Sequence, residues 1–370
     1  MKVALVYDRV NKWGGAERVL LTLHEIFPKA PLYTAVYDSK KASWAKVFPK
    51  VIPSFLQKIP FAKTNHEFLG TFTPIAFESF DFNDYDLVIS ITSEAAKGII
   101  TEPGTLHLCY CLTPTKYLWS DYNFYLKNPG KLGKIPFFPY LAKPFLWYTG
   151  YWDKITAQRP DKIMAISSVV KNRIKKYYKR DSEIIYPPVD VDFFKNTKGN
   201  GYKQKENFYL LVSRLVPYKR VDLAIRAFNK LGLPLFIVGK GVEEENLKKI
   251  AKGNIKFLGE LTDEKLRDYY RRSKALVMPQ EEDFGIVAIE AQAAGTPVIA
   301  FRAGGVLETV IEGKTGVFFD RQKPESLIKA VFKFKRLKFK KEDLLENALK
   351  FSKDKFKQNF LKLINDELNK

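Results

Sequence analysis

The sequence is poor in cysteine and contains no long uninterrupted run of apolar residues. Its two cysteines, Cys109 and Cys111, stand too close together to suggest a disulfide framework, which favours a reducing cytosol. No stretch approaches the ~18 uncharged apolar residues that a membrane-spanning helix needs. The opening MKVALVYDRV is too short an apolar run for a signal peptide and predicts a first core strand.

Positive charge, in contrast, is in excess. The formal net charge is +21, and such a surface attracts nucleic acid or anionic lipid. A lysine-rich but merely solvated surface would give the same composition. A nucleic-acid-binding protein is therefore one hypothesis, but the sequence shows no recognition module and its basic residues do not gather into one helix or arm.

The length and the apolar content predict two domains with large cores, since the chain has 370 residues of which 46% are hydrophobic. Short apolar runs alternate with helical patterns such as residues 14–27, which predicts parallel βαβ units. The expected strands of the first half are KVALVY (2–7), YDLVISIT (85–92), TLHLCYC (105–111) and KIMAIS (162–167).

The same alternation restarts after Pro187-Pro188 and a polar stretch, 195–207, that is typical of a linker. We therefore predict an N-terminal domain over 1–188, a second α/β domain over 189–353, and a C-terminal helix over 354–370 that packs back on the first domain. The expected strands of the second domain are NFYLLVSRL (207–215), PLFIVG (234–239), NIKFLGEL (254–261), KALVMP (274–279) and PVIAF (297–301).

The segment 119–153 fits neither pattern, because it is dense in aromatic residues, proline and lysine. It is either a helical insertion whose aromatic side chains fill local core or an interfacial patch. In a patch, aromatic rings sit at headgroup level and lysines face anionic lipid. Because basic and aromatic residues interleave over the whole segment, we favour the patch.

The stretch EEDFGIVAIEAQAAGTPVIA (281–300) places two carboxylates, Glu282 and Glu290, around an apolar turn. An expected strand runs into Glu282, and a helix then carries Glu290. Gly285 leaves the first-turn amides of that helix facing an anion, and carboxylates in a cleft accept hydrogen bonds from sugar hydroxyls. Helix capping and a structural ion pair are the alternatives, and capping is our interpretation of Glu281.

Two further turns have the residue types of a phosphate site. Arg214 and Lys219 follow the first strand of the second domain, five residues apart, and can converge on a diphosphate. Gly14 and Gly15 follow the first strand of the chain and allow the backbone to approach a phosphate closely. They do not form the GxGxxG fingerprint, so a nicotinamide cofactor is not indicated.

A metal site is not expected. His107, Cys109 and Cys111 lie on one face of an expected strand, but structural zinc normally requires a fourth ligand and a turn.

Together these residues resemble the GT4 family of retaining glycosyltransferases, whose signature E-x7-E matches Glu282 to Glu290. The resemblance covers nearly the whole chain. The chain is similar in particular to a subgroup that includes mannosyltransferases of O-antigen and other surface polysaccharides. Its motifs are GGAERVL, YDLVIS…AKG, TPTKYLW, YPPVDVDFF, SRLVPYKRVDLAI, FLGEL and GGVLETVIEGKTGVFF.

The resemblance implies a GT-B fold, in which two Rossmann-like domains face each other across a cleft. It implies transfer with retention from a nucleotide-diphosphate sugar such as GDP-mannose, by front-face attack and without a required metal or other cofactor. The catalytic residues would be Glu282, Arg214 and Lys219, with Glu282 on the donor sugar and the two cations on the diphosphate. The donor-binding residues implied are Gly14, Gly15, Arg214, Lys219, Phe284, Gly285, Ile286 and Glu290, the last of these on the ribose.

One departure from the family concerns the donor sugar. Many relatives carry a histidine where this chain has Leu112, and an apolar side chain cannot hydrogen-bond a sugar hydroxyl. Lys116 and Tyr117 follow and are candidates for contacts with the acceptor. That acceptor is expected to be a glycolipid or glycan at an anionic membrane surface, which would make the enzyme peripheral on the cytoplasmic face. A nucleotide-sugar epimerase is the alternative of related fold.

Overall fold

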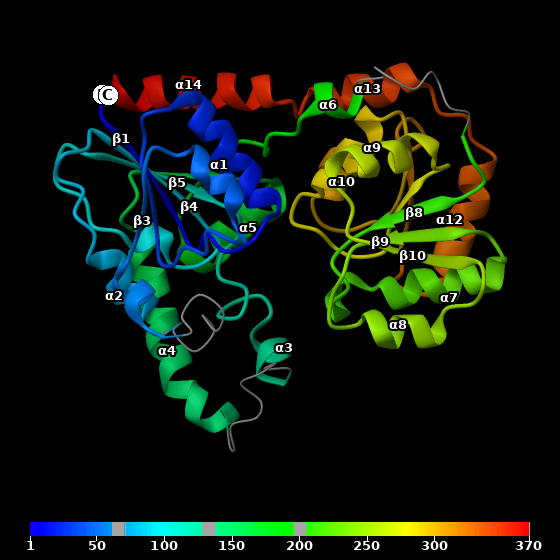
Figure 1. Ribbon diagram of the computed structural model, residues 1–370, viewed down its shortest axis with the longest axis horizontal. Coiled ribbons are helices and arrows are strands. Elements are labelled where there is room, and N and C mark those ends of the chain that lie inside the picture. The colour runs from blue at the N-terminus through cyan, green and yellow to red at the C-terminus, as the bar shows by residue number, and fades with distance from the viewer. Residues whose placement is uncertain (61–69, 71, 128–137, 196–204, 370) are drawn as a thin grey trace. The chain divides into compact units, whose positions relative to one another are not determined.

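The computed structural model describes residues 1–60, 70, 72–127, 138–195 and 205–369. Contacts divide the chain into two compact units (Figure 1), which we call unit 1, Met1–Tyr186 with Lys357–Lys370, and unit 2, Pro187–Phe356. The sequence-based division had placed these boundaries after residues 188 and 353. Most of the expected linker, 195–207, lies outside the described residues.

Unit 1 is built on a seven-stranded parallel sheet with the order β3-β2-β1-β4-β5-β6-β7. Its central strands are the apolar runs of the sequence, and β4 is buried along its whole length, as expected for a parallel sheet covered on both faces. The strands are β1 (Val3–Tyr7), β2 (Leu32–Thr34), β3 (Val51–Pro53), β4 (Leu87–Thr92), β5 (Leu106–Cys111), β6 (Lys162–Ala165) and β7 (Glu183–Ile184).

Helices cover this sheet and short 3-10 turns follow several of its strands. The helix predicted over residues 14–27 is present as α1 and buries its apolar face, including Val19, Leu20 and Leu23. The helices of unit 1 before residue 187 are α1 (Gly15–Ile26), α2 (Thr73–Glu78), α3 (Tyr122–Lys127), α4 (Phe138–Thr156) and α5 (Ser168–Tyr178), with the 3-10 turns η1 (Ser43–Val47), η2 (Phe55–Lys58) and η4 (Ala96–Gly98).

Unit 2 has a six-stranded parallel sheet with the order β10-β9-β8-β11-β12-β13. Its strands are β8 (Tyr209–Val212), β9 (Leu235–Val238), β10 (Ile255–Gly259), β11 (Leu276–Met278), β12 (Val298–Phe301) and β13 (Gly316–Phe319). Its helical segments are α6 (Val191–Lys195), η6 (Pro217–Lys219), α7 (Val221–Leu231), α8 (Glu244–Ile250), α9 (Asp263–Arg272), α10 (Ile286–Ala293), α11 (Val306–Thr309), α12 (Pro324–Lys335) and α13 (Lys341–Leu349).

The apolar core of unit 2 lies between the sheet and helices α7 and α12. Phe228 of α7 and Val331 of α12 are fully buried there, together with Leu211 and Ile237 of the sheet. Both units are therefore Rossmann-like α/β layers, as the sequence predicted.

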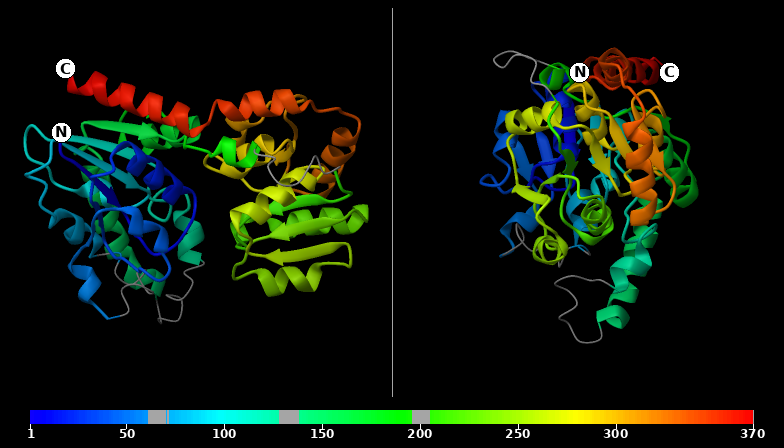
Figure 2. Two further views of the ribbon diagram at one scale, coloured as in Figure 1. Left: turned by 45° about the horizontal axis from the view of Figure 1, so that its top comes forward. Right: turned by 90° about the vertical axis from the view of Figure 1, so that its right-hand side faces the viewer.

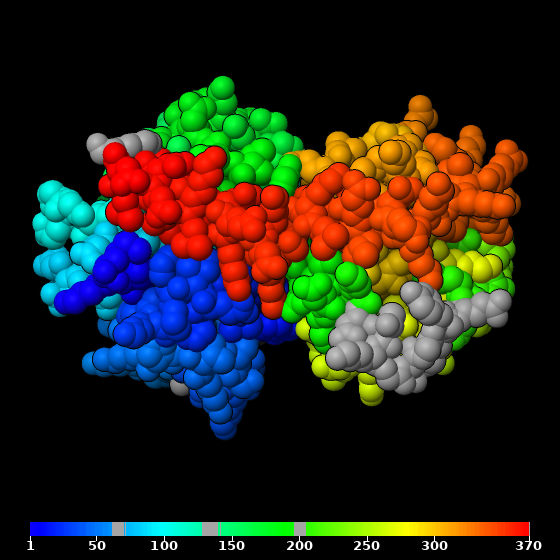
Figure 3. Space-filling view, turned by 90° about the horizontal axis from the view of Figure 1, so that it is seen from above, coloured from blue at the N-terminus to red at the C-terminus, as the bar shows by residue number. Residues whose placement is uncertain are grey.

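The last helix, α14 (Lys353–Leu368), begins in unit 2 and continues into unit 1. Lys357 forms an ion pair with Glu25 of α1 at 2.6 Å, and Phe360 is fully buried against Tyr110 of β5. Figure 3 shows this part of α14 lying along α1. The helix expected over 354–370 thus packs on the first unit.

The aromatic insertion contains two helices, α3 and α4, and residues 128–137 between them lie outside the described ranges. The first half of α4 projects from the sheet of unit 1, as Figures 1 and 2 show. Among the helices of the described ranges, none is both long and apolar enough to cross a membrane.

Candidate functional site

The carboxyl edge of the unit 2 sheet brings together two of the predicted site residues. Open parallel sheets bind ligands at this edge, and β8 and β11 are neighbours in the sheet. The turn after β8 carries Lys219 and the loop after β11 carries Glu282. Lys219 Nζ donates a hydrogen bond to Glu282 Oε1 at 2.5 Å although the residues are 63 positions apart.

Both partners of this pair are mostly shielded from water, with side-chain exposures of 12% for Lys219 and 22% for Glu282. The amide of Gln280 also donates to Glu282 Oε1, at 2.8 Å. The carboxylate is therefore held in one position by two donors, both of which bind Oε1. Sequence reasoning missed Gln280, which no motif in the chain singled out.

Arg214 and Lys219 are linked through Tyr218, which sequence reasoning also missed. Arg214 is exposed and donates to the Tyr218 hydroxyl at 2.7 Å, while the ammonium of Lys219 lies 5.4 Å from the centre of the tyrosine ring. The two cations predicted to converge on a diphosphate thus share one aromatic neighbour. A guanidinium binds phosphate through two hydrogen bonds in one plane, and an ammonium binds it as a point charge; both groups are common in phosphate sites.

Helix α10 begins directly after this loop. Gly285 adopts φ +91°, a conformation that favours glycine, and its N-cap position has no side-chain cap. The first-turn amides from Ile286 onward therefore suit an anion. Phe284 was expected to contact the ligand, but its side chain is buried and packs against Phe351 with ring centres 5.5 Å apart. Only its backbone remains available to a ligand.

The loop after β12 fixes the Glu282 loop from the other side. The amide of Gly305 donates to the carbonyl of Glu282 at 2.7 Å. A Cβ atom on Gly304 would lie 2.3 Å from that carbonyl oxygen, and one on Gly305 would lie 2.4 Å from the Cα of Phe284. This contact explains why the motif GGVLE begins with two glycines, since only glycine permits so close an approach.

Glu290, the second carboxylate of the pair, lies in α10 and is only 2% exposed. Its Oε2 accepts a hydrogen bond from the hydroxyl of Tyr270 at 3.0 Å. A carboxylate that accepts a hydrogen bond from a hydroxyl within the protein has the chemistry to accept one from a ribose hydroxyl.

The carboxyl edge of unit 1 holds the remaining predicted residues. Gly14 is the N-cap of α1, and the Glu17 carboxylate lies just below it, since a Cβ on Gly14 would be 3.1 Å from Glu17 Oε2. Glu17 is 1% exposed and accepts a hydrogen bond from Tyr7 at 2.7 Å. An acidic charge therefore already occupies the positive end of the helix, which disfavours the expected phosphate contact at Gly14 and Gly15.

The loop after β5 carries the acceptor-side candidates, Lys116 and Tyr117, both half-buried. Leu112 is also half-buried at the start of this loop. The potential metal ligands of β5 are packed in the core instead, where His107 Nε2 lies 2.9 Å from Ser90 Oγ. Within the part of the chain that the structure describes, no three His, Cys, Asp or Glu side chains gather as a metal site would require.

Residues 192–351 match a family model described as glycosyl transferases group 1. This match shows that most of unit 2 is similar to the group 1 glycosyl transferases. An uncharacterised glycosyltransferase of Methanocaldococcus jannaschii is 31% identical over 182 residues, 48% of this chain and 50% of that protein. A protein of Mycolicibacterium smegmatis, named GDP-mannose-dependent alpha-(1-6)-phosphatidylinositol monomannoside mannosyltransferase, is 32% identical over 40% of this chain and 46% of its own. The chain spans about half the length of the curated relatives it matches.

Solved structures extend the likeness to both units. The crystal structure of Anabaena HepE in complex with UDP superposes with a TM-score of 0.71 and 18% identity, covering 99% of this chain and 100% of that one. At this identity the likeness establishes the fold, which is GT-B as the sequence predicted. The region that the family model matches contains Glu282, Glu290, Arg214 and Lys219, and every donor residue predicted outside the Gly14-Gly15 turn lies in it.

Proposed function

We propose that the protein is a retaining glycosyltransferase that moves a hexose from a nucleotide-diphosphate sugar to a lipid-linked or polysaccharide acceptor in cell-surface glycan synthesis. The observation that carries the proposal is the contact of Lys219 with Glu282 beside the N-terminus of α10. It places a cation, a carboxylate and helix amides at one ligand edge of the group 1 domain.

Each of these groups binds a different part of the donor. Arg214, Lys219 and the first-turn amides of α10 meet the diphosphate, whose negative charge grows as it departs. Glu282 accepts hydrogen bonds from the sugar, and Glu290 from the ribose. The new bond forms between the acceptor oxygen and the anomeric carbon while the bond from that carbon to phosphate breaks. The acceptor proton passes to the departing phosphate oxygen, so no carboxylate nucleophile is required, unlike in glycosidases.

GDP-mannose or a similar donor is our choice for the nucleotide sugar. The Mycolicibacterium relative is named as GDP-mannose-dependent, whereas the Anabaena structure holds UDP. The charge balance of the cations with the diphosphate supports catalysis without a metal ion.

We further propose that the acceptor lies at a membrane and that the enzyme binds the cytoplasmic face peripherally. Helix α4 supports this, because it exposes several large aromatic side chains rather than burying them. Trp147 is 74% exposed and stacks on Tyr151 with ring centres 6.0 Å apart. We call this surface the α4 aromatic face, and it consists of Tyr140, Phe145, Trp147, Tyr148 and Tyr151.

The charge around the α4 aromatic face suits anionic lipid. Lys143 lies with its ammonium 5.3 Å from the ring of Tyr140, so cation and aromatic ring share one surface, as in interfacial helices. Lys131 and Lys134, which the sequence placed in the same patch, lie outside the described residues.

A thermal-shift panel of UDP-, GDP-, dTDP- and ADP-sugars in the presence of EDTA tests the donor proposal. A saturating cognate donor should add about 2–4 kcal/mol of apparent stability, and Arg214→Ala should abolish most of that gain. Product analysis by NMR should then show the anomeric configuration of the donor retained. Absence of any nucleotide-dependent shift would refute the proposal.

Two outcomes would favour the alternatives. Conversion of the donor into an epimer without an acceptor would make the protein a nucleotide-sugar epimerase. Tight binding of duplex DNA at physiological salt would support a nucleic-acid-binding protein.

A further inference from the structure

Two buried carboxylates lie under the carboxyl edge of the unit 1 sheet and hold its loops in place. The first is Asp8, directly after β1. It is 5% exposed and accepts hydrogen bonds from the loop that follows β4, through the Thr92 hydroxyl at 2.9 Å and the backbone amides of Ser93, Glu94, Ala95 and Ala96 at 2.7–3.1 Å. A single carboxylate therefore fixes the backbone around Glu94.

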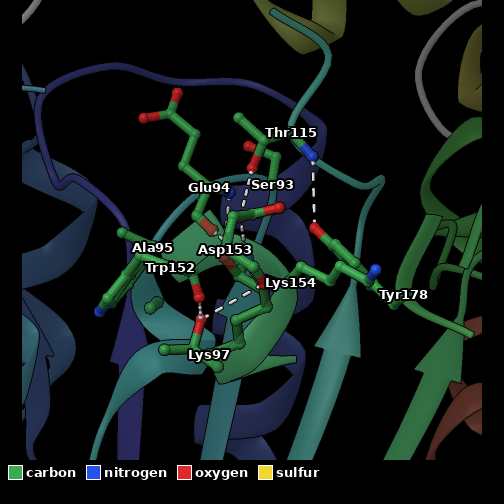
Figure 4. A network of polar contacts seen from close by, with 12 residues as sticks. Ser93, Glu94, Ala95, Lys97, Thr115, Trp152, Asp153, Lys154 and Tyr178 are labelled. Carbon is green, nitrogen blue, oxygen red and sulfur yellow. Dashed lines mark hydrogen bonds and ion pairs between the residues drawn. The ribbon is translucent and has the colours of Figure 1, made fainter. Parts of the chain in front are cut away.

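The second is Asp153, near the end of α4, which is 1% exposed. Its Oδ1 accepts from Lys97 Nζ at 2.5 Å and from the Thr115 hydroxyl at 2.9 Å. Its Oδ2 accepts from the indole of Trp119 at 2.7 Å. Figure 4 shows Lys97, Thr115 and Asp153 converging at the end of α4.

The Asp153 network reaches both loops that flank the edge. Thr115 and Trp119 stand at the two ends of the segment that carries Lys116 and Tyr117, so one carboxylate holds both ends of that segment. Lys97 Nζ also donates to the Glu94 carbonyl at 2.5 Å. Burial lowers the pKa of Lys97, but the charge of Asp153 and its hydrogen bond, together with the charges of Cys111 and Cys109, raise the pKa overall.

The loops that Asp8 and Asp153 hold in place carry three polar side chains, those of Arg9, Glu94 and Tyr117. Arg9 donates to both carboxylate oxygens of Glu94, with its Nη1 at 2.8 Å from Oε2. Both side chains remain partly open to solvent, at 18% and 23%. Figure 4 shows the Glu94 carboxylate pointing away from the Asp153 network. Burial raises the pKa of Tyr117, the charge of Glu94 raises it further, and the charge of Arg9 lowers it.

Arg9, Glu94 and Tyr117 follow three adjacent strands, β1, β4 and β5. They combine a guanidinium, a carboxylate and a phenol at an edge where open sheets bind ligands. The donor residues of the proposed function all belong to unit 2, which leaves this second edge for the second substrate. Its groups match the donors and acceptors of sugar hydroxyls rather than a phosphate, because the carboxylate would repel an anion.

We propose that Arg9, Glu94 and Tyr117 form a subsite that binds hydroxyl groups of the acceptor sugar, and that Asp153 is a positioning residue for it. This inference rests on the proposed function, since it assigns the acceptor of the same reaction. It adds Arg9 and Glu94 to the acceptor side and gives the buried ion pair of Lys97 with Asp153 a role in substrate binding.

Glu94→Gln tests the subsite directly. The substitution keeps the side-chain shape but removes the charge, and we expect the acceptor KM to rise at least about tenfold because a hydrogen bond to a charged group is lost. The donor KM and the thermal shift with bare nucleotide should stay at wild-type values. Glu78→Gln is the matched control, because it weakens a comparable pair with Arg159, at 2.6 Å, on helix α2 of the same unit.

A second pair of variants tests the positioning role without leaving Lys97 unpaired. Trp119→Phe and Trp152→Phe each remove one indole hydrogen bond to a carboxylate, at 2.7 Å to Asp153 and 2.8 Å to Glu78. We expect only Trp119→Phe to raise the acceptor KM, by about threefold to tenfold, with the donor KM unchanged.

The outcomes separate the two proposals. If wild-type protein binds no nucleotide, the proposed function fails. If wild-type protein transfers sugar and Glu94→Gln leaves the acceptor KM unchanged, or changes it no more than Glu78→Gln, the subsite is wrong and the proposed function stands. If Trp119→Phe and Trp152→Phe changed the acceptor KM equally, the role of the Asp153 network would be structural only.

Discussion

Lys219 and Glu282 form an ion pair with a distance of 2.5 Å between Nζ and Oε1, across the loops that follow two neighbouring strands of unit 2. The cation that we propose for the diphosphate and the carboxylate that we propose for the sugar are therefore in contact. Each holds the other in position, so the pair is expected to act as a unit in catalysis.

A double-substitution series tests this coupling. Lys219→Met and Glu282→Gln should each lower kcat by about two orders of magnitude, as loss of one charge-stabilising group does in other enzymes. The double variant should lose much less than the product of the two effects, because each single change already disrupts the pair. Lys230→Met is the control, since it breaks an exposed pair with Glu325 in the same unit. Near-normal turnover of Lys219→Met would remove it from the diphosphate site.

The two glutamates of the E-x7-E pair should differ in what they affect. Glu290 should hold the ribose, which donor and product share, so Glu290→Gln should weaken binding of the bare nucleoside diphosphate about tenfold. Glu282→Gln should leave that affinity nearly unchanged, because the bare nucleotide has no sugar. Isothermal titration calorimetry measures both. Loss of bare nucleotide binding in Glu282→Gln would require the two roles to be exchanged.

The positions of the long apolar strands were predictable from the sequence, but short elements were not. The runs that became β1, β4 and β5 were identified because they are buried on both faces and need continuous apolar residues. Strands β2 and β3 have three residues each and, unlike the equally short β11, do not lie in a run of four or more consecutive apolar residues. Strand β13 lies in GVFF, which the sequence supplied only as part of a family motif.

The site was predictable where it depends on motifs and not where it depends on packing. Lys219 and Glu282 were expected in one site, and the fold brings them into contact. Tyr218 and Gln280 hold these residues from within the loops, and no charge or spacing in the sequence indicated them. Similarly, Gly14-Gly15 has the composition of a phosphate turn, but the buried position of Glu17 became visible only in the fold.

Membrane binding should depend on the α4 aromatic face. The protein should float with anionic vesicles at low salt and much less with neutral ones, since each lysine near an anionic surface contributes about 1 kcal/mol. Trp147→Ser combined with Tyr151→Ser should reduce flotation strongly, because exposed aromatic rings would no longer insert. Replacing Lys131, Lys134 and Lys143 with glutamate should reduce it further.

Phe332→Ser is a suitable control for the flotation experiment. Phe332 is 51% exposed on helix α12 of unit 2, so its loss removes an exposed aromatic ring that is not part of α4. Equal recovery of wild-type protein with neutral and anionic vesicles would exclude the membrane proposal and favour a soluble acceptor.

The stability of the protein should fall between pH 7 and pH 5 partly because of His107. Burial lowers the pKa of His107 to about 3, whereas an unfolded histidine has a pKa near 6.5. Below pH 6.5 the unfolded chain therefore binds a proton that the folded protein does not, and stability is lost as pH falls toward 3. From pH 7 to pH 5 this one group should cost about 2 kcal/mol.

His107→Gln isolates that contribution. Urea unfolding at the two pH values should show a decrease about 2 kcal/mol smaller in the variant than in the wild type. Titrations of other groups, such as the buried Asp8, are common to both proteins and cancel in the difference. The same decrease in both proteins would mean that His107 is protonated in the folded state.

Sugar transfer should depend on the close contact between Gly304 and Glu282. Gly304 and Gly313 both adopt left-handed backbone conformations, with φ +80° and +77°. An alanine at either position should therefore cost about 1 kcal/mol in backbone strain. The two differ in their surroundings, since a Cβ at Gly313 meets nothing within 4 Å, whereas one at Gly304 lies 2.3 Å from the Glu282 carbonyl oxygen.

Gly304→Ala must therefore displace the Glu282 loop, while Gly313→Ala leaves it in place. We expect thermal unfolding to show a small loss of stability for Gly313→Ala and a larger one for Gly304→Ala. Sugar transfer should fall by at least about tenfold in Gly304→Ala alone, because a shift of about 1 Å at a positioned group can cost two orders of magnitude in rate. Equal transfer rates in the two variants would mean that Glu282 does not need the position that Gly304 gives it. Its role on the donor sugar would then pass to another residue of the same edge.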